Sequence, residues 1–242
     1  MSHFSRRNFL FLSSGAAAGT MLVPGAAAGD DNAETGEGLD FSSSGLVTGK
    51  PKALPYKSIP GFLSAEQIAP HYTAHYGGAL RGYTGLDAAL EKSIKTGPAI
   101  EPHAYGAMQR ARTSKGNSVV LHEMYFDGMV AVAPDPAAEV RRAIEKRFGS
   151  LDRWADDFQA SARAASGWAF LAIHPVNGKL YNLVSNEHAQ GLMWMADPLV
   201  VIDVYEHAFY VDYKNRKSDY VTKCMNHINW NAVGARYRAG RA

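Results

Sequence analysis

Apolar residues in the second half of the chain recur at helical spacing. Val140, Ile144 and Phe148 fall on one face of a helix that we expect over residues 137–148. Ser150 can cap a following helix, from residue 151 to about 164, because a serine hydroxyl accepts a hydrogen bond from the first-turn N–H groups. The region after residue 136 therefore begins with two helices.

Three shorter apolar runs then have the length and composition of strands. They cover residues 168–173, 179–184 and 199–204. Asn177-Gly178 separates the first two runs, and this dipeptide is a strong signal for a β-hairpin. Another helix is expected over residues 219–228. The second half therefore predicts a mixed α/β domain with a small three-stranded antiparallel sheet.

The first half of the chain predicts two long helices. Ser64, followed by Gln67 three residues later, forms a capping box, so a helix should run from there to about residue 80 or beyond. A second helix is expected over about residues 104–129, and Pro134-Asp135-Pro136 marks a boundary. We expect an α+β fold: an N-terminal domain that is a long helical hairpin, residues 53–134, followed by a C-terminal mixed α/β domain, residues 135–242.

The first 28 residues have the organisation of an export signal. Arg6 and Arg7 precede a soft apolar stretch, and Ala26-Ala27-Ala28 provides a cleavage site. The arginines followed by Phe9-Leu10 resemble the twin-arginine motif, which implies export of an already folded protein. We expect a mature protein that starts near Gly29, is periplasmic or otherwise exported, and does not associate with the membrane after cleavage. An uncleaved membrane anchor is the alternative.

Residues 29–52 are rich in glycine, serine and acidic residues and lack an apolar period. We therefore expect a flexible linker there, with structure beginning near Leu54. The formal net charge is +2, and Arg6 and Arg7 account for it, so the remaining chain is neutral. A neutral surface argues against nucleic acid as a partner. The single cysteine, Cys224, excludes an intrachain disulfide.

Three histidines and one aspartate are candidates for metal chemistry. Asp203 and His207 are four positions apart where an apolar strand ends, and His71 and His122 fall on the two predicted long helices. Neutral imidazoles with one carboxylate form a mixed nitrogen and oxygen set that suits a redox-active iron or manganese ion. By spacing alone this evidence is weak, and unrelated surface or helix histidines are the favoured alternative, since the chain has nine histidines.

The sequence segments around these residues resemble those of a known family. The segment from Asp203 to Tyr210, Asp-Val-Tyr-Glu-His-Ala-Phe-Tyr, resembles the iron/manganese superoxide dismutase signature Asp-x-Trp-Glu-His-Ala. The resemblance covers about residues 53–238 and is weakest at 84–116. It also includes Leu54-Pro55-Tyr56, Ser166-Gly167-Trp168-Ala169-Phe170-Leu171, Asp219-Tyr220-Val221 and Asn229-Trp230.

This resemblance implies a superoxide dismutase that converts superoxide to dioxygen and hydrogen peroxide. It implies one iron or manganese ion per subunit, with the ligands His71, His122, Asp203 and His207. It further implies a homodimer or higher oligomer. Three residues match positions that support the ligands or meet at the subunit interface of the family: His75, Glu206 and Tyr210.

The chain departs from the family pattern at several positions. The gateway tyrosine, eight positions after the first ligand, is replaced by Ala79, with Tyr76 and Tyr83 nearby. Tyr205 replaces a tryptophan, and Phe209 replaces a common tyrosine. His188 stands where the family has a glutamine or histidine that donates a hydrogen bond near the metal, and the histidine variant favours iron. The departures leave open an alternative function, a metal-binding envelope protein of the same fold with little or no dismutase activity, and also a non-catalytic interaction protein.

Overall fold

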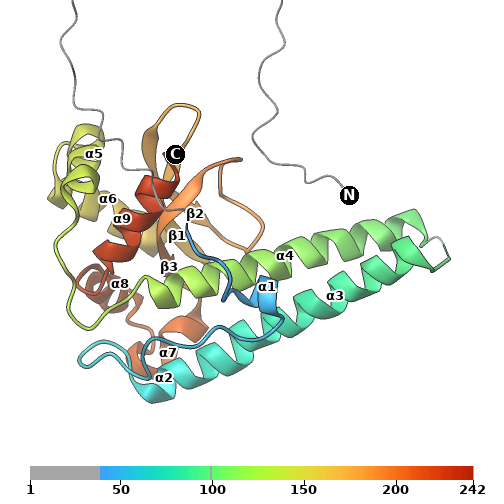
Figure 1. The fold of residues 1–242 in the computed structure, drawn as a ribbon. Helices are drawn as coiled ribbons and strands as arrows, with labels where there is room; N and C mark the ends of the chain where they lie inside the picture. Colours follow the sequence, from blue (N-terminus) through green and yellow to red (C-terminus); the bar gives the residue numbers. More distant parts are fainter. Residues whose placement is uncertain (1–38, 99, 242) are drawn as a thin grey trace, which may run out of the picture. The chain divides into compact units, whose positions relative to one another are not determined.

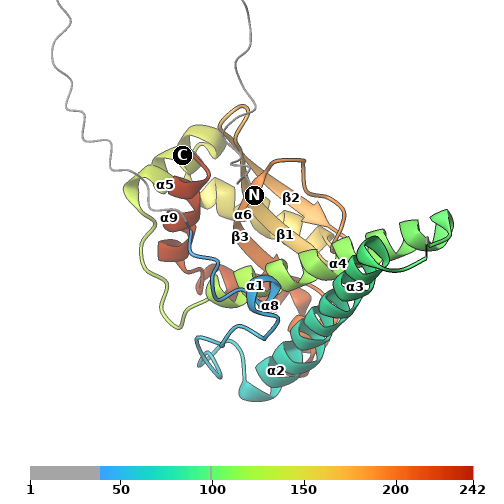
Figure 2. The ribbon, with the colours of Figure 1, turned by 45° about the vertical axis from the view of Figure 1, so that its right-hand side comes forward.

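A computed structural model describes residues 39–98 and 100–241 of the chain (Figures 1 and 2). The predicted export signal and residues 29–38 of the predicted linker lie outside these residues. Within them, the elements as far as residue 164 are helices, three strands follow, and the last elements are again helices. Among the described helices, none combines the length and apolar character that a membrane crossing requires.

The first half forms the predicted helical hairpin. One helical rod consists of α2 (Ala65–Pro70), the segment η1 (His71–Tyr76) and α3 (Gly77–Lys95), and α4 (Pro102–Asp127) returns beside it (Figure 1). Ser64 is confirmed as the N-cap, because its Oγ accepts a hydrogen bond of 3.1 Å from the Gln67 N–H. The reciprocal half of the predicted capping box is wrong, because the Ser64 N–H donates to Asp212 Oδ2 at 2.8 Å instead. Each helix starts within two residues of the predicted position.

Glycines inside α3 and α4 allow the two helices to approach closely. A Cβ atom added to Gly116 would lie 3.2 Å from the ring of Tyr83, and one added to Gly82 would lie 3.1 Å from the side chain of Lys115. Glycine lowers intrinsic helix stability, but here it lets large side chains of the neighbouring helix lie against the backbone. Tertiary packing therefore outweighs propensity, and α3 continues to Lys95.

A π-helical segment interrupts the first rod where it carries two histidines. Pro70 is the last residue of α2, and proline has no N–H with which to continue the i to i−4 hydrogen-bond ladder. The next six residues, His71–Tyr76, form the wider π-helix, a form that recurs at functional sites. The sequence prediction anticipated a helix here but not this change of pitch.

The second half contains the predicted antiparallel sheet, in the order β2-β1-β3. Its strands are β1 (Trp168–His174), β2 (Lys179–Ser185) and β3 (Asp197–Asp203). The predicted hairpin joins β1 to β2, but its loop has the four residues 175–178, and Gly178 at its end adopts a positive φ of 63°. The helix α6 (Leu151–Ala164) packs against β1 and β2, whereas α4 and α9 (Trp230–Ala239) pack against β3. This half also contains α5 (Ala138–Phe148), the short segments η2 (Glu206–Ala208) and α7 (Tyr210–Tyr213), and α8 (Lys217–Met225).

The prediction of a flexible linker as far as residue 52 is wrong for residues 39–52. This segment, which we call the strap, contains the short helix α1 (Gly45–Thr48) capped by Ser44. Its ordering comes from contacts with the hairpin. The Gly45 N–H donates to Glu123 Oε1 at 2.7 Å, and Lys52 Nζ lies 2.6 Å from Asp127 Oδ2. A local composition of small and polar residues could not reveal partners that lie about 75 positions later.

A buried arginine joins the sheet to the hairpin. Arg236 is 8% exposed and donates from Nη1 to Leu199 O at 2.9 Å and from Nη2 to Met124 O at 3.1 Å. The register of β1 with β3 shifts at Leu199, and Met124 is in the last turn of α4, so neither carbonyl has a regular ladder partner. Burial lowers the pKa of Arg236 to about 10, so it remains charged at neutral pH.

We predict that Arg236→Met lowers the free energy of unfolding by about 2–4 kcal/mol, because two buried carbonyl groups lose their donor. Urea denaturation of the purified protein measures this loss. The control is Arg238→Met in the same helix, where the exposed Arg238 pairs with Glu139 at 2.8 Å. That variant should lose less than about 1 kcal/mol. Equal losses in the two variants would contradict the assignment.

Candidate metal centre

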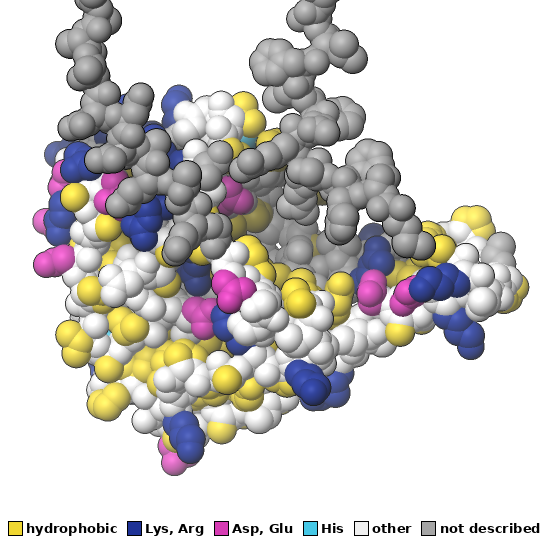
Figure 3. Space-filling view, viewed as in Figure 1, with side chains coloured by type: hydrophobic (Ala, Val, Ile, Leu, Met, Phe, Trp, Pro, Cys, Tyr) yellow, Lys and Arg dark blue, Asp and Glu magenta, His cyan; other side chains and the backbone are white. Residues whose placement is uncertain are grey.

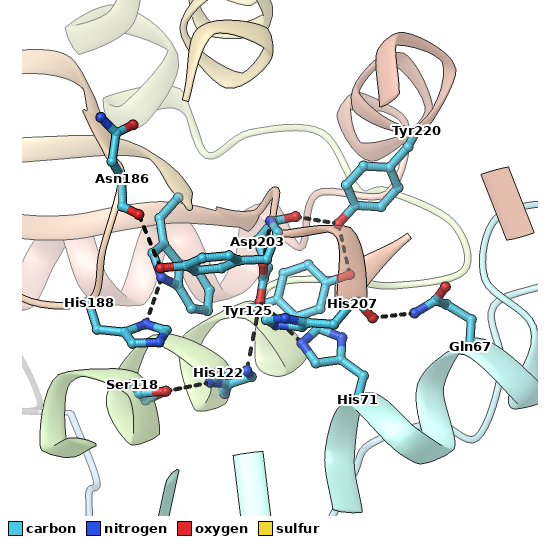
Figure 4. Close-up of polar contacts among 12 residues, drawn as sticks. Gln67, His71, Ser118, His122, Tyr125, Asn186, His188, Asp203, His207 and Tyr220 are labelled. Atoms are coloured by element: carbon cyan, nitrogen blue, oxygen red, sulfur yellow. Dashed lines mark hydrogen bonds and ion pairs between the residues drawn. The ribbon is translucent and has the colours of Figure 1, made fainter. Parts of the chain in front are cut away.

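Four side chains that are far apart in the sequence converge between the hairpin and the sheet (Figure 4). The Nε2 atoms of His71 and His207 lie 3.1 Å and 3.2 Å from Asp203 Oδ2, and His122 Nε2 lies 3.7 Å from the same oxygen. The donor atoms of these four residues all lie within 4.8 Å of one another. His71, His122 and Asp203 are at most 1% exposed. The chain therefore assembles a buried cluster of three imidazoles and one carboxylate.

The end of β3 orients the carboxylate of Asp203. Its Oδ1 accepts a hydrogen bond of 3.0 Å from the Tyr205 N–H, which turns the chain sharply after the strand. The hydroxyl of the buried Tyr220 donates to the Asp203 carbonyl at 2.8 Å. Because Oδ1 is engaged by the backbone, Oδ2 is the oxygen that faces the three imidazoles. Sequence reasoning missed this role of Tyr220.

The ring of His122 presents a lone pair to the cluster. Its Nδ1 lies 2.6 Å from Ser118 O, and a carbonyl oxygen can only accept, so the proton of the neutral ring is on Nδ1. Nε2 is then an acceptor. Among the described residues this buried atom has no hydrogen-bond partner. An unsatisfied buried nitrogen beside a carboxylate and two other imidazole nitrogens is the arrangement that a metal ion completes.

A glutamine positions the last histidine of the cluster. His207 lies in the short 3₁₀ segment η2 (Glu206–Ala208), which follows β3. Gln67 of α2 is 1% exposed; its Nε2 donates to His207 O at 2.6 Å, and its Oε1 accepts from the Val211 N–H at 2.9 Å. Sequence reasoning identified Gln67 only as part of a helix cap. No pattern in the sequence around Gln67 indicates that it positions His207, because His207 is 140 positions away.

The electrostatics of the cluster favour metal ligation. Burial lowers the pKa of His122 to about 3 and lowers that of His71 as well, so both rings are neutral at pH 7. Burial alone would raise the pKa of Asp203, but hydrogen bonds from His207 and His71 outweigh burial and hold that pKa below its usual range. Neutral imidazoles with an ionised carboxylate are in the protonation state that metal ligands need. The residues present therefore fit an iron or manganese ion.

His188 lies beside the cluster with a defined tautomer. Trp168 Nε1 can only donate, and it lies 3.0 Å from His188 Nδ1, so the proton of the neutral His188 ring is on Nε2. Burial lowers the pKa of His188, which favours this neutral form. The ring centroid is 6.4 Å from that of His122 and 5.3 Å from that of Tyr205. Asn117 Nδ2 donates to His188 O at 2.9 Å and holds the loop against α4.

Of the other predicted site residues, one contacts the cluster within the chain and two face outwards. The exposed ring of His75 stacks on His207, with 3.8 Å between centroids. Glu206 is exposed, and Tyr210, the first residue of α7 (Tyr210–Tyr213), is 47% exposed. Both line a surface pocket of about 470 Å³ beside the end of β3. The single chain does not bring them to the four candidate ligands.

The hydroxyl of Tyr76 does not occupy the position vacated by the gateway tyrosine. It donates to Glu123 Oε1 at 2.8 Å and accepts from the Lys52 N–H at 2.8 Å, so it belongs to the strap contacts. Tyr83 lies further along α3, against Gly116 of α4. Ala79 is buried and supplies no polar group. Sequence reasoning also missed Glu123, a nearly buried carboxylate directly after the candidate ligand His122.

Comparison with protein-family models supports the C-terminal half of this picture. Residues 136–236 match the model of iron/manganese superoxide dismutases, C-terminal domain. The match includes the sheet, Asp203 and His207. His71 and His122 lie before it, in the hairpin.

Curated relatives extend the similarity into the hairpin. The chain is 34% identical over 180 residues to an iron superoxide dismutase of Aquifex aeolicus, covering 72% of this chain and 84% of the relative. It is 33% identical over 181 residues to an iron superoxide dismutase of Cupriavidus metallidurans, covering 73% and 89%. A manganese superoxide dismutase of Haloferax volcanii is 28% identical over 188 residues, covering 77% and 93%. Relatives named for either metal are therefore similar to this chain.

Proposed function

This chain belongs to the iron/manganese superoxide dismutase family and is a superoxide dismutase, and we propose that its reaction takes place at one ion held by His71, His122, Asp203 and His207. The observation that carries the assignment is the convergence of the three Nε2 atoms on Asp203 Oδ2. The unsatisfied Nε2 of His122 supports it, because no protein donor competes for that lone pair among the described residues.

The ion, when bound, supplies one-electron redox chemistry by which one superoxide is oxidised to dioxygen and a second is reduced to hydrogen peroxide. The groups around it fix the orientation of the ligands and carry a proton beside the site. Ser118 O and Gln67 fix the orientation of two ligand residues. His188 carries a proton on Nε2, and we assign it the role of hydrogen-bond donor to solvent or anion beside the cluster. The half-buried Tyr205 packs its ring on His207, which limits the access of water to that ligand.

We propose iron as the preferred metal. The support is His188, which matches the histidine variant of the outer donor position, and a donor to solvent at a metal tunes the solvent's pKa and the reduction potential of the ion. Manganese is the competing metal, since relatives are named for both. Metal analysis of protein purified from cells supplied with both metals decides between them.

A metal-binding protein with little dismutase activity is the second candidate function. Two observations favour it: Ala79 replaces the gateway tyrosine, and the hydroxyl of Tyr76 is bound by Glu123 and Lys52. The dismutation rate per bound ion in the wild-type protein distinguishes the candidates. A rate no faster than that of the free aqueous ion would favour the second.

We also propose a homodimer or a higher oligomer. The exposed Glu206 and Tyr210 lie within a few residues of the ligand His207, and both match family positions that meet across a subunit interface. A second subunit would cover these side chains. It would bring Glu206 to the ligand His207 of the partner subunit and Tyr210 to His75 of the partner subunit.

The export of the mature protein is a further proposal, supported by the resemblance of Arg6-Arg7 and Ala26-Ala27-Ala28 to a twin-arginine signal with its cleavage site. Periplasmic location would place the enzyme where superoxide formed outside the cytoplasm can reach it.

The first prediction from this proposed function tests the ligand set. Asp203→Ala should reduce bound metal from about one ion per subunit to near zero and abolish dismutation, because it removes the only carboxylate of the cluster. His188→Ala should keep the metal while activity falls about 10- to 100-fold. Metal analysis and a superoxide assay on the same samples measure both. Full metal content and activity in Asp203→Ala would refute the assignment, whereas metal loss in His188→Ala would refute only the role of His188.

The second prediction concerns assembly. Glu206→Ala should shift the protein towards monomer in sedimentation velocity at micromolar concentration and reduce metal retention, because the proposed partner contact to His207 is lost. Glu145→Ala, which removes an exposed carboxylate from α5, is the matched control and should sediment as wild type. A metal-loaded wild-type monomer under these conditions would contradict the proposal.

The third prediction concerns export. Replacing Arg6 and Arg7 together by lysine conserves charge but removes the paired guanidinium groups. Precursor should then accumulate in the cytoplasm, as detected by immunoblotting of fractionated cells. Unchanged export would exclude the twin-arginine route.

A further inference from the structure

A cleft on the C-terminal domain, away from the metal centre, has five cations and one acidic residue among its lining residues. It has a volume of about 1040 Å³ and lies between α5, the β1–β2 turn and the end of α9. Dark blue side chains lie over α5 in the space-filling view, with magenta ones among them (Figure 3). The cationic lining residues come from these three elements: Arg142, Lys146, Arg147, Lys179 and Arg241. None of them contributes to the metal cluster.

This concentration of positive charge is not balanced locally. Glu139 is the one acidic residue of the lining, and its carboxylate already pairs with Arg238, which is not a lining residue, at 2.8 Å. Within the described residues, no ion pair is made by Arg142, Lys146 or Lys179. The chain as a whole has 25 cationic and 23 anionic side chains. The excess of positive charge in the cleft is therefore local and does not reflect a basic surface overall.

Two of the guanidinium groups are held in place. Arg147 donates from Nε to Leu180 O at 2.9 Å and lies 5.5 Å from the ring of Tyr181, which orients its outer nitrogens. Arg241 donates from Nη1 to the hydroxyl of Tyr237 at 2.7 Å. Guanidinium groups fixed in this way lose little conformational entropy when they bind a phosphate through two parallel hydrogen bonds. The cleft is thus partly organised for an anion.

We propose that this cleft binds a soluble anion that carries several phosphate groups. Five cations from three elements exceed what one phosphate can contact, whereas a chain of linked phosphates reaches several at once. The concave shape favours a small molecule, because the volume is that of a ligand pocket. The phosphates of a flat membrane surface would reach only the rim. This binding is independent of the dismutase reaction.

Inorganic tripolyphosphate is the probe, tested by calorimetry with the full-length, metal-loaded protein. Binding should weaken as salt increases, because the contacts are ionic. The triple variant Arg142→Gln, Lys146→Gln and Lys179→Gln should bind about tenfold more weakly or worse. Orthophosphate should bind the wild type much more weakly than tripolyphosphate. Dismutase activity should be unchanged in the variant, which shows that it is folded and loaded.

The matched control removes three cations elsewhere, through Lys50→Gln, Lys92→Gln and Lys95→Gln, all at exposed positions. It should bind tripolyphosphate within about twofold of wild type, because all five cleft cations remain. Its overall charge equals that of the cleft variant, so a difference between the two variants is not an effect of net charge. Equal weakening in both variants, or no binding by the wild type, would overturn the proposal. A second arm uses vesicles of 70% phosphatidylcholine and 30% phosphatidylglycerol. Vesicle binding that depends on the cleft residues and is not displaced by tripolyphosphate would also overturn it, in favour of a lipid surface.

Discussion

The carboxylate of Asp203 is the group on which the rest of the structure depends. It is fully buried at the end of β3, and an isolated buried carboxylate is costly unless it is paired and hydrogen-bonded. Its partners come from the π-helical segment, from α4 and from the turn after β3. The hairpin and the sheet must therefore be correctly placed before this charge is compensated. A metal ion would replace those contacts by stronger ones at the same place.

Two further connections keep the halves of the molecule in register around that carboxylate. Gln67 joins the start of the hairpin to the segment after β3, and Arg236 joins the end of α4 to the irregular position of β3. Each is buried, and each satisfies backbone groups that regular secondary structure leaves unpaired. Their shared effect is to set the distance between the elements that carry the histidines.

Much of this could be predicted from the sequence, because the signals were local. The strands, the hairpin that Asn177-Gly178 indicated and the Ser64 cap each depend on neighbouring residues and were confirmed. Asp203 and His207 were identified because residues 203–210 resemble the family signature. The structure brings these two residues together with His71 and His122. What escaped prediction depends on distant partners. The strap is held in place by a hydrogen bond to Glu123, and the hydroxyl of Tyr76 is hydrogen-bonded to both Lys52 and Glu123. Neither of these contacts is signalled by a pattern in the neighbouring sequence.

The strap has a consequence for the order of events during synthesis. It precedes every other described segment on the ribosome, yet the carboxylate that binds Gly45 is 78 positions later. The Asp203 oxygen that faces His71 is 132 positions after that histidine. Contacts of such long sequence separation form late, because the intervening chain must first be made and its loop closed. The nascent chain therefore gains its N-terminal contact once α4 has emerged, and its metal cluster only after β3. A chain that ends before residue 203 would contain Glu123, the partner of the strap, but no Asp203 carboxylate for His71 and His122.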